Sequence, residues 1–116
     1  MPTLPDEDLV RLWHMLEAAR KAQEMAGGRD RENLDTDEQL SLALQRLIEI
    51  VGEAATKVSA ETCSQTDDIP WKQIRGMRNR LIHAYFDVNL DILWNTVTED
   101  LPPLVSALES LLGSEG

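Results

Sequence analysis

Apolar residues at helical spacing run through most of this chain, and this spacing limits the possible folds more than any other feature. Between Asp6 and about Met25, apolar side chains recur at steps of three and four, as Leu9, Leu12, Trp13, Leu16 and Ala19. Such steps place the side chains on one face of a helix. No segment alternates apolar and polar residues with the period of a β-strand. The spacing therefore predicts an all-α fold.

A second helix is predicted from about Asp37 to Ser59. Thr36 and Gln39 have the spacing of a capping box, in which both side chains bind free backbone groups at a helix start. Apolar residues cover more than half of this helix, which predicts a central position or a place at a subunit interface. They are Leu40, Leu44, Leu47, Ile48, Ile50, Val51, Ala54, Ala55 and Val58.

Two further helical stretches complete the predicted fold. The sequence from Asp67 to Pro70 is a favourable start for a helix from Trp71 to about Phe86. Beyond a short break, helical spacing continues to the C-terminus, where Pro102-Pro103 should kink or divide the helix. We therefore expect residues 1–116 to form a single domain, a bundle of four to five helices.

Composition narrows the class of protein. The chain is 42% hydrophobic and 28% charged, which excludes disorder, and no apolar run approaches the roughly 18 residues of a membrane helix. Its start lacks the features of a signal peptide, and the single Cys63 cannot form an internal disulfide. We expect a cytoplasmic protein without membrane association. One cysteine and two histidines are too few for a structural zinc site, and no metal or cofactor is expected.

The charge distribution predicts a local contact with RNA. A net charge of −10 argues against a general polyanion binder. The segment from Ile69 to Phe86, however, contains no Asp or Glu and carries +4, which leaves −14 for the rest of the chain. A compact positive site suits a short RNA contact, and its candidate residues are Lys72, Arg75 and Arg80. The alternative is that these cations merely pair with acidic neighbours.

Arg78 falls in the middle of an apolar helix face on a helical wheel. The neighbours on that face are Trp71, Ile74, Met77, Leu81, Ile82 and Tyr85. An arginine in such a place requires a carboxylate or a bound phosphate. Glu49 or Glu53, one turn apart on the polar side of the second helix, could supply the carboxylate. Phosphate binding and an internal ion pair are therefore both possible at this stage.

A second row of side chains has the composition of a ribonuclease site. Arg75, Asn79 and His83 follow each other at four-residue steps. RNA cleavage without a metal needs a base, an acid and a cation that stabilises the phosphorane. His83 can transfer protons, Arg78 can bind phosphate oxygens, and Asn79 can orient the phosphate or the 2′-hydroxyl. His14 has no comparable neighbours and is assigned to the surface or to packing.

One histidine cannot easily act as acid and base in the same step. Two copies of the predicted helix around His83, meeting across a symmetric dimer, would supply both groups. The chemistry therefore predicts a homodimer with a composite site at its axis.

The string from Arg78 to Tyr85 resembles the Arg-x-x-x-x-His-x-Tyr signature of HepT-like toxins, which are HEPN-domain proteins. Similarity extends to Gly52-Glu53-Ala54, to Ile69-Pro70-Trp71 and to Asp100-Leu101-Pro102. The resemblance implies a homodimeric HEPN helical bundle in which two motif copies form one RNA-cleaving cleft. It also implies that Arg78 and His83 are catalytic and that Asn79 supports them.

The resemblance further implies a partner protein. HepT-like toxins pair with a minimal nucleotidyltransferase antitoxin that transfers AMP to the tyrosine of the signature, here Tyr85. An AMP group two residues from His83 would place a bulky anion in the cleft, where it would block substrate and occupy Arg78. The alternative is that Tyr85 is a packing aromatic at the edge of the apolar face.

Three functions are therefore compared. The first is an RNA-cleaving toxin that acts on transfer or messenger RNA. The second is a non-enzymatic dimeric module that binds and positions a nucleotidyltransferase, with Arg78 held by an internal carboxylate. The third is nucleotide binding without cleavage. An open cleft favours the first, a closed ion-pair network the second, and a closed pocket the third.

Overall fold

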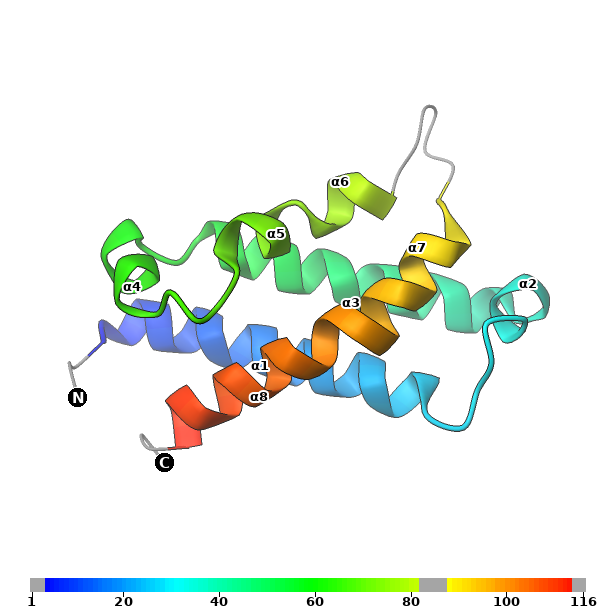
Figure 1. Cartoon of the computed structure of the whole chain (residues 1–116), viewed down its shortest axis with the longest axis horizontal. Helices are drawn as coiled ribbons and strands as arrows, with labels where there is room; N and C mark the ends of the chain where they lie inside the picture. The colour runs from blue at the N-terminus through cyan, green and yellow to red at the C-terminus, as the bar shows by residue number, and fades with distance from the viewer. Residues whose placement is uncertain (1–3, 82–87, 114–116) are drawn as a thin grey trace.

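The structure, a computed structural model, describes residues 4–81 and 88–113, except for the side chain of Arg78. These residues form an all-α fold, as the sequence predicts. Helices α1 (Asp6–Ala26) and α3 (Glu38–Thr56) lie side by side and run in opposite directions, and α8 (Leu101–Gly113) packs across α1 (Figure 1). Within the described residues, no helix combines the length and hydropathy that a membrane crossing requires.

Helix α3 has the central position that its apolar surface predicts. It contacts α1 on one side and the segment after residue 70 on the other. The largest fully buried side chains come from all parts of the bundle and include Leu12, Met15, Leu16, Leu44, Ile48, Leu93, Leu101, Leu104 and Leu108. Full burial of one such side chain contributes about 1.5–3 kcal/mol. Trp13, predicted for the apolar face of α1, is instead 38% exposed, and His14 is exposed as expected.

The start of α3 differs from the predicted capping box. Asp37 is the N-cap, and its Oδ1 accepts a hydrogen bond from the backbone N–H of Leu40 at 3.0 Å. This hydrogen bond is the main cause that holds the pKa of Asp37 below its ordinary value. Thr36 ends a separate short helix, α2 (Asn33–Thr36). The capping box was wrong because an adjacent carboxylate satisfies the first free N–H groups at the positive end of the helix.

The two possible caps can be separated by mutation. Asp37→Ala should lower the melting temperature by a few degrees, because the N–H of Leu40 loses its acceptor. Thr36→Ala should change it much less, since the hydroxyl of Thr36 only donates to the carbonyl of Asn33 at 3.5 Å. Thermal unfolding followed by circular dichroism measures both. A larger decrease in melting temperature for Thr36→Ala than for Asp37→Ala would support the capping box instead.

A short helix that the sequence pattern did not predict follows α3. Helix α3 ends at Thr56, three residues before the predicted end, because Ser59 begins α4 (Ala60–Gln65) as its N-cap. The buried carboxylate of Asp8, in the first turn of α1, accepts hydrogen bonds from Ser59 N at 3.0 Å, Ser59 Oγ at 2.6 Å and Thr62 Oγ1 at 2.5 Å. These contacts, which we call the Asp8 cluster, join the start of α1 to α4.

The C-terminal stretch stays helical from Leu90 to Gly113, and where a kink or division was predicted its helical form changes just before the two prolines. Helix α7 (Leu90–Asn95) continues into a π-helical turn, η2 (Thr96–Asp100), and then into α8. Pro102 and Pro103 lie in the first turn of α8, where their missing N–H groups cost least. The N–H of Leu101 reaches the carbonyl of Thr96, one residue further than in an α-helix.

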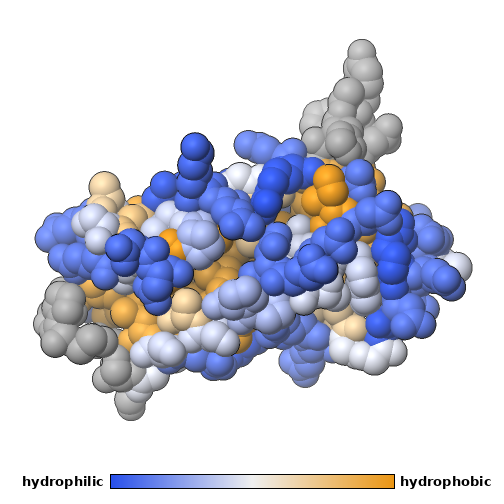
Figure 2. Space-filling model, viewed as in Figure 1, coloured by the Kyte–Doolittle hydropathy of each residue, from blue (hydrophilic) through white to orange (hydrophobic). Residues whose placement is uncertain are grey.

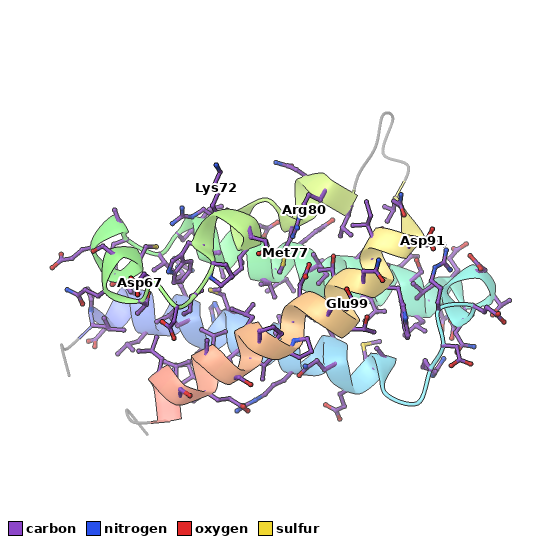
Figure 3. All side chains as sticks on the ribbon, viewed as in Figure 1. Asp67, Lys72, Met77, Arg80, Asp91 and Glu99 are labelled. Atoms are coloured by element: carbon purple, nitrogen blue, oxygen red, sulfur yellow. The ribbon has the colours of Figure 1, made fainter. Side chains whose placement is uncertain are left out.

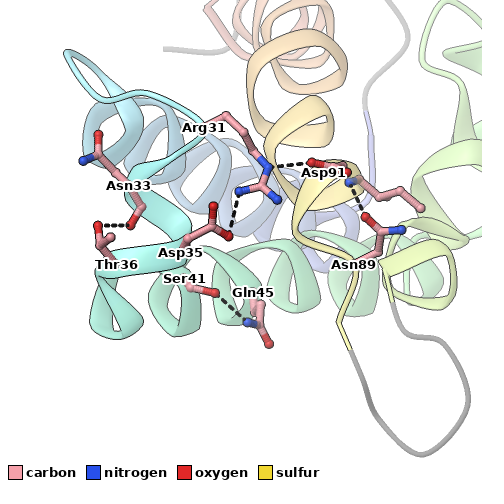
Figure 4. Close-up of polar contacts among 9 residues, drawn as sticks. Arg31, Asn33, Asp35, Thr36, Ser41, Gln45, Asn89 and Asp91 are labelled. Carbon is pink, nitrogen blue, oxygen red and sulfur yellow. Dashed lines mark hydrogen bonds and ion pairs between the residues drawn. The ribbon is translucent and has the colours of Figure 1, made fainter.

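Polar contacts join α7 to α2 and to the end of α6 (Met77–Leu81). The guanidinium of Arg31 binds Asp91 at 2.7 Å and Asp35 at 3.1 Å, and so joins α7 to α2 (Figure 4). Asn89 caps α7 by accepting from Ile92 N at 3.1 Å, and its own N–H donates to the carbonyl of Leu81 at 2.8 Å. This second hydrogen bond holds the start of α7 close to the end of α6.

Candidate active site

The helix predicted from Trp71 to Phe86 is divided in its described part. Helix α5 (Trp71–Arg75) ends where Gly76 donates to the carbonyl of Lys72 at 3.2 Å, and α6 begins where Arg80 donates to the carbonyl of Gly76 at 3.1 Å. A continuous helix was wrong because glycine costs about 1 kcal/mol in a helix interior relative to alanine. The predicted row of Arg75, Asn79 and His83 is therefore not on one unbroken helix.

The predicted apolar face exists in spite of this break. Trp71, Ile74, Met77 and Leu81 are all buried against the bundle. The indole N–H of Trp71 donates to the carbonyl and the hydroxyl of Thr66, at 3.2 and 3.1 Å, which anchors α5 to the segment after α4. Ile82 and Tyr85, predicted for the same face, lie outside the described residues.

The central motif residues are only partly described. Arg78 and Asn79 lie in α6, which packs against α3. Asn79 is exposed, and its side chain makes no hydrogen bond within the described residues. His83 lies outside the described residues. The roles of Arg78, Asn79 and His83 therefore stay predictions.

Two carboxylates, Glu49 and Glu53, lie on α3, the helix against which α6 packs. Arg46 binds Glu49 at 3.2 Å and lies 3.7 Å from Glu53. Both glutamates thus have an arginine of their own helix as a neighbour. Whether either of them also pairs with Arg78, as the sequence suggested, stays an open alternative because that side chain is not described.

The three predicted RNA-contacting cations have different surroundings. The guanidinium of Arg75 lies 5.9 Å from the centre of the Trp71 ring, and its Nη2 is 3.0 Å from Cys63 Sγ. Arg80 donates to the carbonyl of Gln73 at 3.4 Å and lies 3.8 Å from a carboxylate oxygen of Asp100. Among the described residues, pairing with an acidic neighbour, the alternative to RNA binding, thus applies to Arg80 but not to Arg75.

Lys72 differs from the other two cations because its side chain makes no polar contact with the described residues. It is exposed, extends away from the bundle in Figure 3, and forms no ion pair with the described carboxylates. Its ammonium group is therefore available for a ligand anion. Within residues 4–81 and 88–113, no three side chains of His, Cys, Asp or Glu are placed to hold a metal ion.

A hollow lies at the division between α5 and α6. It has a volume of about 560 Å³, opens widely to solvent, and is lined by Pro70, Trp71, Lys72, Gln73, Gly76 and Arg80. We call it the α5–α6 hollow. The sequence analysis did not predict it, although a glycine within a predicted helix was a signal for such a break.

The comparison with protein families identifies the chain. Residues 15–111 match the family described as ribonuclease HepT-like. The chain belongs to the HepT-like ribonuclease family. The matched residues include the whole string from Arg78 to Tyr85, and the HepT-like resemblance inferred from that string is confirmed.

Curated relatives of this HepT-like chain carry ribonuclease names. A candidate RNase of Caldanaerobacter subterraneus is 36% identical over 90% of the chain and 93% of the relative. A probable ribonuclease HepT of Thermococcus cleftensis is 39% identical over 69% and 73%, and a candidate RNase of Methanocaldococcus jannaschii is 32% identical over 84% and 90%. No solved structure matches the chain. These relatives support a ribonuclease function.

Proposed function

We propose that this chain is a metal-independent ribonuclease toxin of a toxin–antitoxin pair, which cleaves transfer or messenger RNA. The observation that carries the proposal is membership of the HepT-like ribonuclease family together with an intact Arg78 to Tyr85 string inside the matched residues. The positive segment on an otherwise acidic chain supports a short contact with RNA.

The proposed reaction uses only side chains of this chain. A base removes the proton of the ribose 2′-hydroxyl, and the resulting oxygen attacks the adjacent phosphorus while an acid protonates the leaving 5′-oxygen. His83 supplies the proton-transfer groups, Arg78 stabilises the charge on the phosphorane, and Asn79 orients the phosphate. The products are a 2′,3′-cyclic phosphate and a 5′-hydroxyl.

We also propose a homodimer, in which the two copies of His83 act as base and acid. Mixed dimers of wild type and His83→Ala would then lack one of the two groups. After subunits have been mixed at a constant total concentration, activity should follow the square of the wild-type fraction. The measurement is RNA cleavage across a series of mixing ratios. A linear dependence would show that each copy acts alone.

We further propose that a minimal nucleotidyltransferase antitoxin inhibits the toxin by adding AMP to Tyr85. With such an enzyme and ATP, the peptide that contains Tyr85 should gain the mass of one adenylyl group, and RNA cleavage should fall with the modified fraction. Mass spectrometry and a cleavage assay measure the two effects. If Tyr85→Phe still gains the adenylyl group, Tyr85 is not the residue that accepts AMP.

The proposal as a whole is tested with total RNA and the purified chain, free of partner and of AMP, with EDTA present throughout. Cleavage is the expected result. A folded dimer that leaves the RNA intact would instead support the non-enzymatic module that positions a nucleotidyltransferase.

A further inference from the structure

We propose that the α5–α6 hollow is a nucleotide subsite, in which one base of the RNA substrate contacts the apolar wall and the adjoining phosphate lies between Lys72 and Arg80. This inference rests on the proposed ribonuclease function. It assigns a position that holds the RNA strand, and Arg80 is the one lining residue of this position that belongs to the Arg78 to Tyr85 string.

The walls of the hollow suit a flat base. Pro70 and Trp71 contribute apolar surface, and Gly76 contributes backbone without a side chain. A Cβ atom at Gly76 would meet only the carbonyl oxygens of Lys72 and Gln73, at 3.5 and 3.7 Å, so the space on this side is open. The volume of about 560 Å³ lies within the range of small-molecule sites.

The charge of the hollow matches a phosphate. The surface of the hollow itself is almost entirely apolar, but the side chains that line it include two cations, whose charged groups lie at its edge, and no carboxylate. The ammonium of Lys72 has no ion-pair partner among the described residues, and the ion pair of Arg80 with Asp100 is long, at 3.8 Å. A phosphate oxygen at hydrogen-bond distance would bind Arg80 more strongly than this contact does. The chain as a whole has a net charge of −10, which repels anions, so a place where two cations come together is where an anion can bind.

A neighbouring hollow is lined by carboxylates, in contrast to the α5–α6 hollow. It lies between α5–α6 and the start of α8, has a volume of about 270 Å³, and includes Asp68, Glu99 and Asp100 in its lining. Figure 2 shows a mostly hydrophilic face with apolar surface visible between the hydrophilic side chains. Hollows on this chain therefore differ in charge, and three carboxylates would repel RNA from the neighbouring one.

The shape and position of the α5–α6 hollow favour an RNA strand over a free mononucleotide. The hollow is open, so a strand can enter and leave it. Arg80 follows Arg78 and Asn79 within α6, a helix of five residues that is about 7 Å long. A strand whose reactive phosphate lies at Arg78 would therefore reach the hollow within a few nucleotides. Arg75 is not included, because Trp71 and Cys63 hold its guanidinium.

The test measures RNA binding without cleavage. A fluorescent single-stranded RNA is titrated into full-length His83→Ala, and into the same protein with Lys72→Ala and Arg80→Ala added. We expect Kd to rise roughly tenfold or more at low salt, and the slope of log K against log salt to fall by about 0.7 for each lost phosphate contact. The matched control is the double variant Lys21→Ala and Lys57→Ala, which removes two exposed cations outside the hollow. We expect this control to change Kd and the salt slope much less.

A second variant tests the base contact without changing charge. Gly76→Leu should fill the hollow and weaken binding, whereas Gly76→Ala should weaken it far less. In the chain with intact His83, Gly76→Leu should raise KM severalfold and leave kcat nearly unchanged, because the hollow lies outside the proposed reacting groups. Circular dichroism checks that both variants fold.

Cross-linking locates the bound base directly. RNA that contains 4-thiouridine should cross-link to the peptide around Trp71 and Gln73. If wild type cleaves RNA but the hollow variants bind and cleave like their controls, the subsite is refuted and the ribonuclease proposal stands. If wild type neither binds nor cleaves RNA, both proposals fail. Cross-links from this peptide to a second copy of the chain, with RNA binding unchanged by the variants, would assign the hollow to a protein interface.

Discussion

His83→Ala is expected to slow RNA cleavage by roughly 10²–10⁴-fold, the usual contribution of general acid–base catalysis. Arg78→Ala should cause a comparable loss, because the phosphorane would lose its cation. Arg78→Lys should recover only part of the activity, since an ammonium keeps the charge but not the planar pair of donors. Initial rates on one defined RNA, at saturating protein and with EDTA present, measure all three variants.

The chain contains a suitable control for His83→Ala. His14 is exposed on α1, and the proposed reaction does not use it. His14→Ala should therefore cleave RNA at the wild-type rate. A folded His83→Ala that keeps the wild-type rate would remove this residue from the mechanism, and an equal loss in His14→Ala would show that the assay reports a general defect.

The largest expected effect on stability lies in the Asp8 cluster. Asp8→Ala should lower the free energy of unfolding by about 2–4 kcal/mol, because it removes charge-assisted hydrogen bonds and leaves the donors of Ser59 and of the buried Thr62 without their acceptor. Urea unfolding at neutral pH measures the difference. Glu7→Gln, in the same turn but exposed, should change stability much less.

The contribution of the Asp8 cluster should depend on pH. Burial raises the pKa of Asp8, but the hydrogen bonds from Ser59 and Thr62 outweigh burial and hold the pKa below its ordinary value of 3.8. A lowered pKa in the folded state stabilises the protein above the ordinary pKa, and this stabilisation is lost as the pH falls through the lower, folded value. The stability difference between wild type and Asp8→Asn should therefore shrink in acid. A difference that stays constant down to low pH would show that Asp8 acts through packing alone.

Long helices could be predicted from the sequence because apolar spacing determines them. Helix α1 begins at the predicted residue, and α3 is central as expected. Helices α2 and α4 were missed because four and six residues are too few to show an apolar period. The break at Gly76 was missed because one glycine is often tolerated within a helix. Pro102 and Pro103 predicted a kink or a division, whereas the structure has a π-helical turn just before them in a stretch that stays helical.

The candidate site could be predicted less completely, because tertiary contacts decide which cations are available. In the sequence, Lys72, Arg75 and Arg80 are equivalent basic residues of one segment. In the fold, Arg75 lies against Trp71 and Cys63, while Lys72 and Arg80 share a hollow. The role of Asp8 was also missed. Its position one turn before Leu12 on the buried face of α1 was the signal.

The most direct test of the ribonuclease proposal is the chemistry of the cut ends. A defined RNA is incubated with partner-free wild type in EDTA, beside the same RNA with a 2′-deoxyribose at the cleaved position. The proposed mechanism predicts a 2′,3′-cyclic phosphate and a 5′-hydroxyl from the first RNA and no cleavage of the second. Products with a 5′-phosphate, cleavage of the 2′-deoxy substrate, or no cleavage by a folded dimer would contradict it.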